Sequence, residues 1–142
     1  DRDAVYAMAD RFLRETTYAD FMRPDPERLR ASIEPFIDAP DRLLLVAEGD
    51  ARVVGMIALL VYAHPFSGEL TAYEVCWWVE PEARGAGVRL LRAAEQWARE
   101  QGTVAMQMVA PSGRVGAFYE RMGYVPVETS YQRTWANEVT TW

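Results

Sequence analysis

The stretch from Tyr73 to Gly102 constrains the fold most, because it predicts three elements in a fixed order. The apolar and aromatic run from Tyr73 to Val79 predicts a buried strand, since β-branched and aromatic residues suit a pleated surface. A turn with two glycines follows. Apolar residues then recur from Leu90 to Ala98 at the spacing of one helical face, and Gly102 stands where helices commonly end. The order strand, glycine turn, helix predicts an α/β fold.

The glycine turn is a candidate anion-binding site because a helix begins there. The first turn of a helix leaves backbone N–H groups unpaired, and the aligned peptide dipoles make that end partly positive. Gly85 and Gly87 carry no side chain that would hold an anion away from those N–H groups. Arg84 and Arg89 add positive charge on either side. The turn is therefore predicted to bind phosphate.

Two common phosphate loops are excluded. A Walker A loop ends in Gly-Lys-Ser/Thr, and the chain contains no lysine. A dinucleotide fingerprint needs a further glycine three positions after Gly87, where Leu90 stands. The pattern also lacks the strand-helix-strand unit that would open a dinucleotide-binding chain.

Residues 84–89 resemble instead the acyl-CoA pyrophosphate loop of the GNAT superfamily of N-acyltransferases, written Q/R-x-x-G-x-G/A. Arg84 and Gly87 match the first two fixed positions, and Arg89 replaces the small residue at the third. The stretch from Ala117 to Tyr124 resembles a late helix and the following strand of the same superfamily, with the consensus apolar-Tyr-Glu-x-x-Gly-aromatic. The two motifs lie in the order that the superfamily shows. The resemblance covers most of the chain from residue 43 onward.

The remaining elements are predicted from periodicity, caps and turns. A first helix carries an apolar stripe from Ala4 to Phe12, with Asp1 or Asp3 as its N-cap. A second helix begins at the sequence Asp-Pro-Glu of residues 25–27. Two prolines are expected to bound it, Pro35 by kinking or shortening it and Pro40 by ending it.

Three strands joined by short links follow these helices, which predicts an antiparallel meander over residues 43–48, 53–63 and 69–79. After the glycine-turn helix, a strand, a helix and a last strand are expected over residues 104–109, 114–122 and 124–134. A strand-helix-strand unit places its strands parallel, so the sheet should be mixed. The chain length predicts one domain over residues 1–142. The resemblance implies a GNAT-like fold whose usual first strand is either missing or lies outside this sequence.

The resemblance implies direct attack of an amine on the thioester of acetyl-CoA. The cofactor must then be held, the carbonyl polarised, a proton removed from the amine and a proton returned to the thiolate. The resemblance implies that backbone groups from Trp77 to Val79, at the end of the strand before the turn, polarise the carbonyl. Core packing alone would also explain the side chains of Trp77 and Trp78. The implied cofactor-binding residues are Trp77, Trp78, Val79, Arg84, Gly85, Ala86, Gly87, Val88, Arg89, Ser112 and Tyr119.

Two residues are the candidate catalytic groups. Tyr119 stands where the family places a tyrosine beside the thiol, and a phenol can return a proton to a thiolate; a half-buried aromatic filling space is the alternative. Ser112 stands where many relatives carry an asparagine that contacts the cofactor. Glu74 is the candidate base, but strict alternation puts it on the face opposite Trp77, so the role requires a bulge. Water relayed to Glu69, to Glu74 or to a loop acid is the alternative.

Composition limits the partners and the chemistry. The net charge of -6, without a basic run, argues against a nucleic-acid partner. The longest apolar run, 53–63, is far shorter than the ~20 residues that span a bilayer, so no membrane partner is expected. Cys76 is the only cysteine, which favours a reducing, cytoplasmic compartment. Its side chain is expected to pack as a small buried hydrophobe. His64 is the only histidine and is expected in a loop, which excludes a multi-histidine metal site; no metal cofactor is expected.

The prediction is therefore an N-acetyltransferase that uses acetyl-CoA and a primary amine of a small molecule or peptide. A GNAT-like domain that binds acyl-CoA or a protein partner without turnover is the alternative, and Arg89 favours it. A longer acyl-CoA donor is a third reading. The sequence does not identify the acceptor, and a homodimer through the aromatic C-terminal strand stays open. The tail from Asn137 to Trp142 is expected to fray unless its tryptophan docks.

Overall fold

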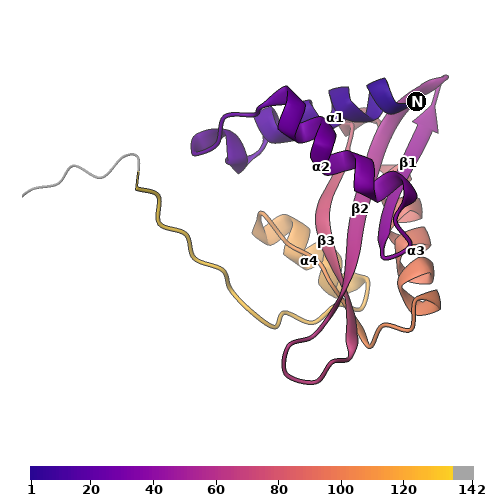
Figure 1. Cartoon of the computed structure of the whole chain (residues 1–142), viewed down its shortest axis with the longest axis vertical. Coiled ribbons are helices and arrows are strands. Elements are labelled where there is room, and N and C mark those ends of the chain that lie inside the picture. Colours follow the sequence, from indigo (N-terminus) through magenta and orange to yellow (C-terminus); the bar gives the residue numbers. More distant parts are fainter. Residues whose placement is uncertain (136–142) are drawn as a thin grey trace, which may run out of the picture. The chain divides into compact units, whose positions relative to one another are not determined.

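The computed structural model describes residues 1–135, and the predicted fraying of Asn137 to Trp142 lies outside them. The chain divides into two compact units, Asp1–Met108 and Val109–Trp142. The elements of the first unit are α1 (Arg2–Glu15), η1 (Thr17–Asp20), α2 (Pro26–Asp38), β1 (Arg42–Gly49), β2 (Arg52–Ala63), β3 (Leu70–Val79), η2 (Pro81–Ala83), α3 (Gly85–Glu100) and β4 (Ala105–Gln107) (Figure 1). The second unit contains α4 (Gly113–Arg121).

The four strands form one sheet in the order β1-β2-β3-β4. Strands β1, β2 and β3 pair antiparallel, and β4 pairs parallel to β3. The predicted meander and the predicted mixed sheet are therefore confirmed. Short links make the meander because neighbouring antiparallel strands need only a turn between them, whereas the parallel pair needs the crossover through α3.

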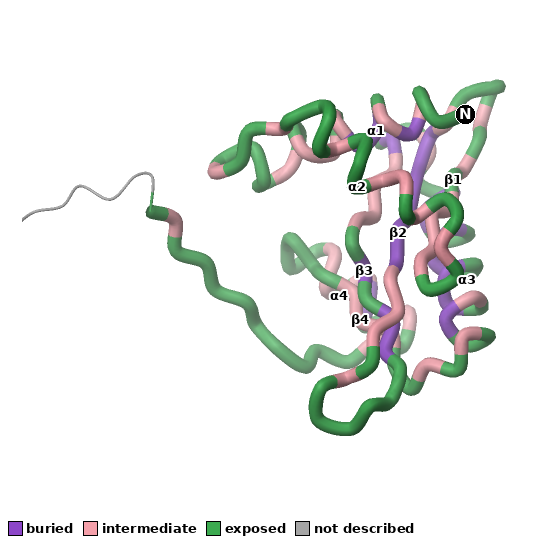
Figure 2. Tube along the Cα trace, viewed as in Figure 1, coloured by how far each residue is buried: buried purple, intermediate pink, exposed green. Residues whose placement is uncertain are grey.

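Helices cover both faces of this sheet in the first unit. On β2, Met56 packs with Met8 and Ala9 of α1, with α2 side chains around them. The neighbouring residue, Gly55, faces the other side, where an added Cβ would lie 3.2 Å from Leu90 of α3. Figure 1 shows α1 and α2 on one side of the strands and α3 on the other, and Figure 2 shows the buried residues gathered along β2 and one face of α3.

The helix ends follow the residues that predicted them. The side chain of Asp1 accepts a hydrogen bond from the backbone N–H of Ala4 at 3.1 Å, and Asp25 caps α2 in the same way. Gly102 has a φ of +76°, a conformation that suits glycine just past a helix end. Helix α2, however, is not shortened at Pro35 and runs on to Asp38.

The predicted last strand over residues 124–134 is wrong, because the structure has no strand there. Its side chains are largely exposed, Tyr131 by 92%. β-Branched and aromatic residues favour an extended chain, but a strand forms only where a neighbouring strand supplies backbone hydrogen bonds. Strand β4 is also shorter than the predicted range of 104–109, since only Ala105–Gln107 pairs with β3.

Candidate active site

Strand β3 carries the bulge that a role for Glu74 requires. Cys76 pairs with Ala58 of β2, and Glu74 pairs with the next residue, Leu59, so Val75 is an extra residue between them. Trp77 pairs with Ile57, which lies two residues before Leu59 on the same face of β2. The bulge therefore returns Glu74 to the face of Trp77. The Glu74 side chain is buried there, with the residue 9% exposed.

Strands β3 and β4 part immediately before this bulge. They pair only where Thr71 to Tyr73 lie beside Ala105 to Gln107. From Glu74 to Val79, β3 keeps its pairing with β2 but has no described strand on the other side. Backbone N–H and C=O groups at a strand edge are the groups that an extended ligand can pair with.

The first turn of α3 follows the end of this open edge, after the short helix η2. The residue before the helix, Arg84, makes no side-chain cap, and both Arg84 and Arg89 are exposed. Gly85 is also exposed, and an added Cβ would meet no atom within 4 Å. The positive end of the helix is therefore open to solvent at Gly85, where two guanidinium groups add charge.

Gly87 has a packing role that the sequence did not predict. It is buried, and an added Cβ would lie 3.3 Å from both Trp77 Cζ2 and Val79 Cγ2. Its backbone N–H donates to the carbonyl of Arg84 at 3.0 Å. Gly87 thus lets α3 pack closely on β3, while Gly85 leaves the anion approach open.

Substituting these two glycines should therefore have different effects. Gly87→Val forces side-chain atoms against Trp77 and Val79, so we expect it to lower the free energy of unfolding by about 1–3 kcal/mol. Gly85→Val meets open space and should change it by less than about 0.5 kcal/mol. Urea denaturation of the two variants measures the difference. Equal losses would contradict the packing role of Gly87.

The two tryptophans of β3 lie on opposite faces of the sheet. Trp77 faces α3 through its contact with Gly87. Trp78 pairs with Met56 on the face of α1 and packs edge-on against Phe12, with ring centroids 6.3 Å apart. Among the described residues, the buried indole N–H of Trp78 has no hydrogen-bond partner. Packing therefore explains the Trp78 side chain, while the backbone of both residues lies on the open edge.

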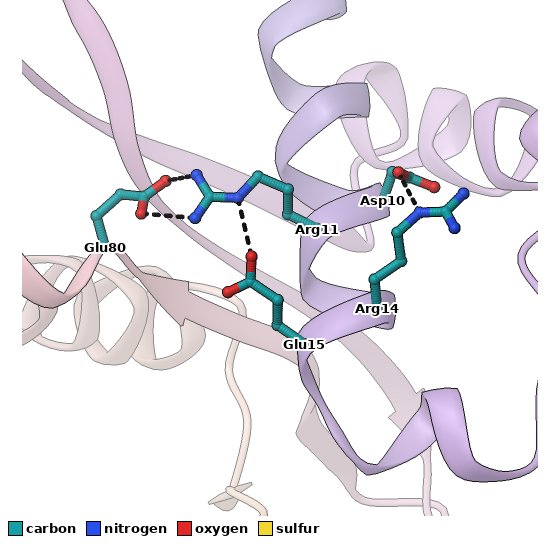
Figure 3. Close-up of polar contacts among 5 residues, drawn as sticks. All are labelled: Asp10, Arg11, Arg14, Glu15 and Glu80. Carbon is teal, nitrogen blue, oxygen red and sulfur yellow. Dashed lines mark hydrogen bonds and ion pairs between the residues drawn. The ribbon is translucent and has the colours of Figure 1, made fainter.

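A buried ion pair that the sequence did not reveal fixes the end of β3. The carboxylate of Glu80 accepts hydrogen bonds from both terminal nitrogens of Arg11 on α1, and its side chain is 5% exposed (Figure 3). The Nε of Arg11 also donates to Glu15, at 3.3 Å. The backbone N–H of Glu80 donates to the carbonyl of Val54 at 2.8 Å. Glu80 thus ties α1 and β2 to the segment that leads into α3.

The second unit contains the other two predicted site residues. Tyr119 lies on α4, is 5% exposed, and its hydroxyl donates to the carbonyl of Val109 at 3.2 Å. Its ring centroid lies 5.5 Å from that of Tyr124. The Ser112 hydroxyl oxygen accepts from the N–H of Val115 and caps α4. Ser112 therefore has a structural role within this unit.

The single cysteine and the single histidine have local roles. Burial raises the pKa of the Cys76 thiol to about 12, because the thiolate would lose its hydration, and the nearby Glu74 carboxylate adds to the shift. The thiol is therefore protonated at neutral pH and packs as a small hydrophobe, as predicted. His64 lies in the β2–β3 loop, where its Nδ1 accepts from the N–H of Phe66 at 3.2 Å. Among residues 1–135, no cluster of three His, Cys, Asp or Glu side chains could hold a metal ion.

A mixed sheet, a bulged strand that parts from its neighbour and a glycine turn into a helix define an α/β protein. A family model described as the acetyltransferase (GNAT) family matches residues 6–124. The chain belongs to the GNAT acetyltransferase family. A comparison with curated protein sequences gives no match.

Solved structures share the fold over most of the chain. A transcriptional regulator from Bacillus halodurans C-125 superimposes with a TM-score of 0.77 at 19% identity, covering 95% of each chain. A ribosomal-protein-alanine N-acetyltransferase from Brucella melitensis biovar Abortus 2308 gives 0.66 at 20% identity, covering 94% of each chain. A glucosamine-6-phosphate N-acetyltransferase from Arabidopsis thaliana gives 0.69 at 12% identity, covering 92% of each chain. None of the described helices is long and apolar enough to cross a lipid bilayer.

Proposed function

We propose that the protein transfers an acetyl group from acetyl-CoA to a primary amine of a small molecule or peptide. One observation carries this proposal: the bulged part of β3 that has no described strand on one side leads, through the short helix η2, to the start of α3, which is exposed at Gly85. A ligand with an extended arm and a diphosphate could bind both features at once. The edge offers backbone groups to the arm, and the helix start offers positive charge to the diphosphate.

In this proposal, backbone groups bind the donor more than side chains do. The N–H groups at the very start of the helix, at Gly85 and Ala86, and the exposed Arg84 and Arg89 guanidinium groups hold the diphosphate, since the Gly87 N–H already donates to the Arg84 carbonyl. The backbone from Trp77 to Val79 aligns the arm and polarises the thioester carbonyl. When bound, acetyl-CoA supplies the thioester that the amine attacks. With a net charge of -6, the protein needs such a local positive end to receive a polyanion.

We assign Glu74 the role of base for the amine proton. The bulge at Val75 supports this assignment, because it places the carboxylate on the face of Trp77, where an alternating strand would not. The other candidate, Glu69, is exposed in the loop before β3. A carboxylate with little exposure can act on a proton in a water-poor setting, which favours Glu74.

We assign Tyr119 the role of acid that returns a proton to the thiolate. Its place in the stretch from Ala117 to Tyr124 and its buried hydroxyl support this role. The hydroxyl carries one proton, which it donates to the Val109 carbonyl here, so the transfer requires the O–H to turn from that carbonyl to the thiolate. A phenol with an ordinary pKa near 10 lies close enough to a thiol near 8.5 for the transfer.

Tyr119→Phe removes this proton and should lower kcat by about 10²-fold, with the KM for acetyl-CoA nearly unchanged. The lost hydrogen bond to Val109 should also lower the free energy of unfolding by about 1 kcal/mol. Steady-state kinetics and denaturation separate the two effects. Tyr124→Phe, on the neighbouring ring, is the matched control and should leave kcat within twofold. A large rise in KM with unchanged kcat would show that Tyr119 only packs.

Gly85→Glu tests the diphosphate site without disturbing the core. A carboxylate in the first helical turn stabilises the helix, but it repels a diphosphate, and at 4 Å the repulsion of two charges is about 1–4 kcal/mol. We expect the Kd for acetyl-CoA, measured by calorimetry, to rise roughly ten- to a hundredfold. Gly85→Gln is the uncharged control, and it should lose less than half of the binding free energy that Gly85→Glu loses. Unchanged affinity in Gly85→Glu would place the diphosphate elsewhere.

A domain that binds acyl-CoA without turnover is the second candidate, favoured by Arg89 at a position where the family motif has a small residue. Calorimetry with acetyl-CoA, followed by an assay of CoA release with a panel of primary amines, separates the two. Binding together with release supports the enzyme. Binding without release from any amine supports the second candidate, and no binding contradicts both.

A further inference from the structure

A cavity of about 300 Å³ lies within the first unit, between α1, η1, α2 and the sheet. Its floor is formed by the buried residues Ala9, Met56 and Ala58. Its exposed rim includes Ser32 of α2 and Val75 of β3. The cavity therefore reaches from the core of the first unit to solvent beside the β3 bulge.

The cavity wall is apolar. None of the described side chains that line it carries a charge, and most are aliphatic or aromatic. The Ser32 hydroxyl is already used, since it donates to the carbonyl of Leu29 at 2.7 Å. The raised pKa of the Cys76 thiol, which also lines the cavity, reflects the same lack of hydration. A charged group would lose its hydration there without compensation, whereas a hydrocarbon group would gain.

The cavity lies on the opposite face of the sheet from α3. Met56 and Cys76 face α1 and α2, whereas Trp77 faces α3. The proposed donor site uses the start of α3 and the edge of β3, so the cavity is left for the other substrate. Val75, the extra residue of the bulge, lies on the exposed rim, so the cavity opens at the edge of β3 where the donor is proposed to bind, while the Glu74 side chain lies on the other face of the sheet.

We propose that this cavity receives an uncharged hydrocarbon group of the amine acceptor, of phenyl or indole size, while the amine stays outside at the bulge. The assignment of the cavity to the acceptor rests on the proposed function, whereas the presence of the cavity does not. A cavity of about 150 Å³ is enough to hold benzene, so 300 Å³ accommodates a larger ring or a branched alkyl group. The acceptor class is then arylalkyl or alkyl amines rather than polyamines or aminosugars.

Methionine-methyl NMR tests the cavity directly, without turnover. With ¹³C-methyl methionine protein, 2-phenylethylamine should shift the Met56 signal in a saturable way and leave Met106 of β4 unchanged. Ethanolamine carries the same amine without the hydrocarbon group and should shift neither. If phenylethylamine leaves Met56 unchanged up to millimolar concentration, or if ethanolamine shifts it equally, the inference is overturned.

Two variants of α2 link that signal to the cavity. Ser32→Leu places a side chain at the rim from an exposed position and should weaken phenylethylamine binding at least tenfold. Ala31→Leu adds the same bulk at an exposed neighbour that does not line the cavity, and should bind as the unmodified protein does. Equal binding in all three proteins would overturn the inference. Circular dichroism confirms that both variants fold.

Kinetics then separate the acceptor from the donor as the source of the hydrocarbon group. Along a series of alkylamines with acetyl-CoA, each added methylene should raise kcat/KM roughly fourfold until the cavity is full. If instead only longer acyl-CoA donors gain in this way, the cavity serves the acyl chain and the acceptor assignment is wrong. A shift at Met56 without any acetyl-CoA binding would contradict the proposed function and leave the cavity in place.

Discussion

Glu74→Gln is expected to lower kcat by about 10²–10⁴-fold at neutral pH, the contribution that a positioned acid or base makes to a rate. The amide keeps the size of the buried carboxylate, so the fold and the affinity for acetyl-CoA should be retained. The loss follows from the bulge at Val75, which turns Glu74 to the face of Trp77. Steady-state kinetics with a saturating amine measure the effect.

Glu69→Gln is the matched control for this variant. Glu69 lies just before β3 in an exposed position and could act only through relayed water. We expect its kcat to stay within threefold of the unmodified protein. If Glu69→Gln loses activity while Glu74→Gln retains it, the base has been assigned to the wrong carboxylate.

Arg11→Met should be the most destabilising substitution outside the apolar core. The Glu80 side chain is 5% exposed and would lose the guanidinium that donates hydrogen bonds to it and balances its negative charge. Removing one partner of a buried pair is strongly destabilising; because Arg11 is itself 45% exposed, we expect the free energy of unfolding to fall by less than in a fully buried pair but by more than in Arg14→Met. Urea denaturation measures it. The affinity for acetyl-CoA should fall as well, because Glu80 leads into the turn before α3.

Arg14→Met provides the comparison, since Arg14 pairs with Asp10 on the same helix but both side chains are more exposed (Figure 3). A surface pair of this kind contributes about 0–1 kcal/mol. The double variant Arg11→Met with Glu80→Gln should recover part of the loss, because no buried charge is left without a partner. Equal losses in Arg11→Met and Arg14→Met would show that burial of Glu80 has no energetic consequence.

The sequence predicts what local patterns and short links determine. The meander, the cap at Asp25, the helix end at Gly102 and the strand before the glycine turn all depend on residues close together in the chain. Each is set by backbone preference or by alternation over one element. The loop and helix motifs were sufficient to indicate the family that the family model shows.

The features that the sequence did not determine depend on distant partners. Arg11 and Glu80 are far apart in the chain, and nothing near either residue distinguishes a buried pair from two exposed charges. The extra residue at Val75 follows from the register of β3 against β2, which no single strand encodes. The last strand was expected because residues 124–134 favour an extended chain, but that preference supplies no pairing partner.

Gly87 belongs to the motif that indicated the family, but the role predicted for it from the sequence was incomplete. The sequence suggested that both glycines expose backbone N–H groups to an anion. In the structure Gly87 is buried against Trp77 and Val79, and Gly85 alone of the two borders open space. A small residue required for close packing and one required for ligand access look the same in a sequence, because both appear as the absence of a side chain.

An amide NMR titration with acetyl-CoA tests the central claim most directly. In ¹⁵N-labelled protein, the N–H signals of Gly85 to Val88 and of Trp77 to Val79 should shift together and saturate at one Kd, because one ligand is proposed to bind both segments. Signals from the β2–β3 turn at Ser67 and Gly68, at the opposite end of β3 from Val79, should stay fixed. Saturable binding that leaves the signals of Gly85 to Val88 unchanged would contradict the claim that the start of α3 holds the diphosphate.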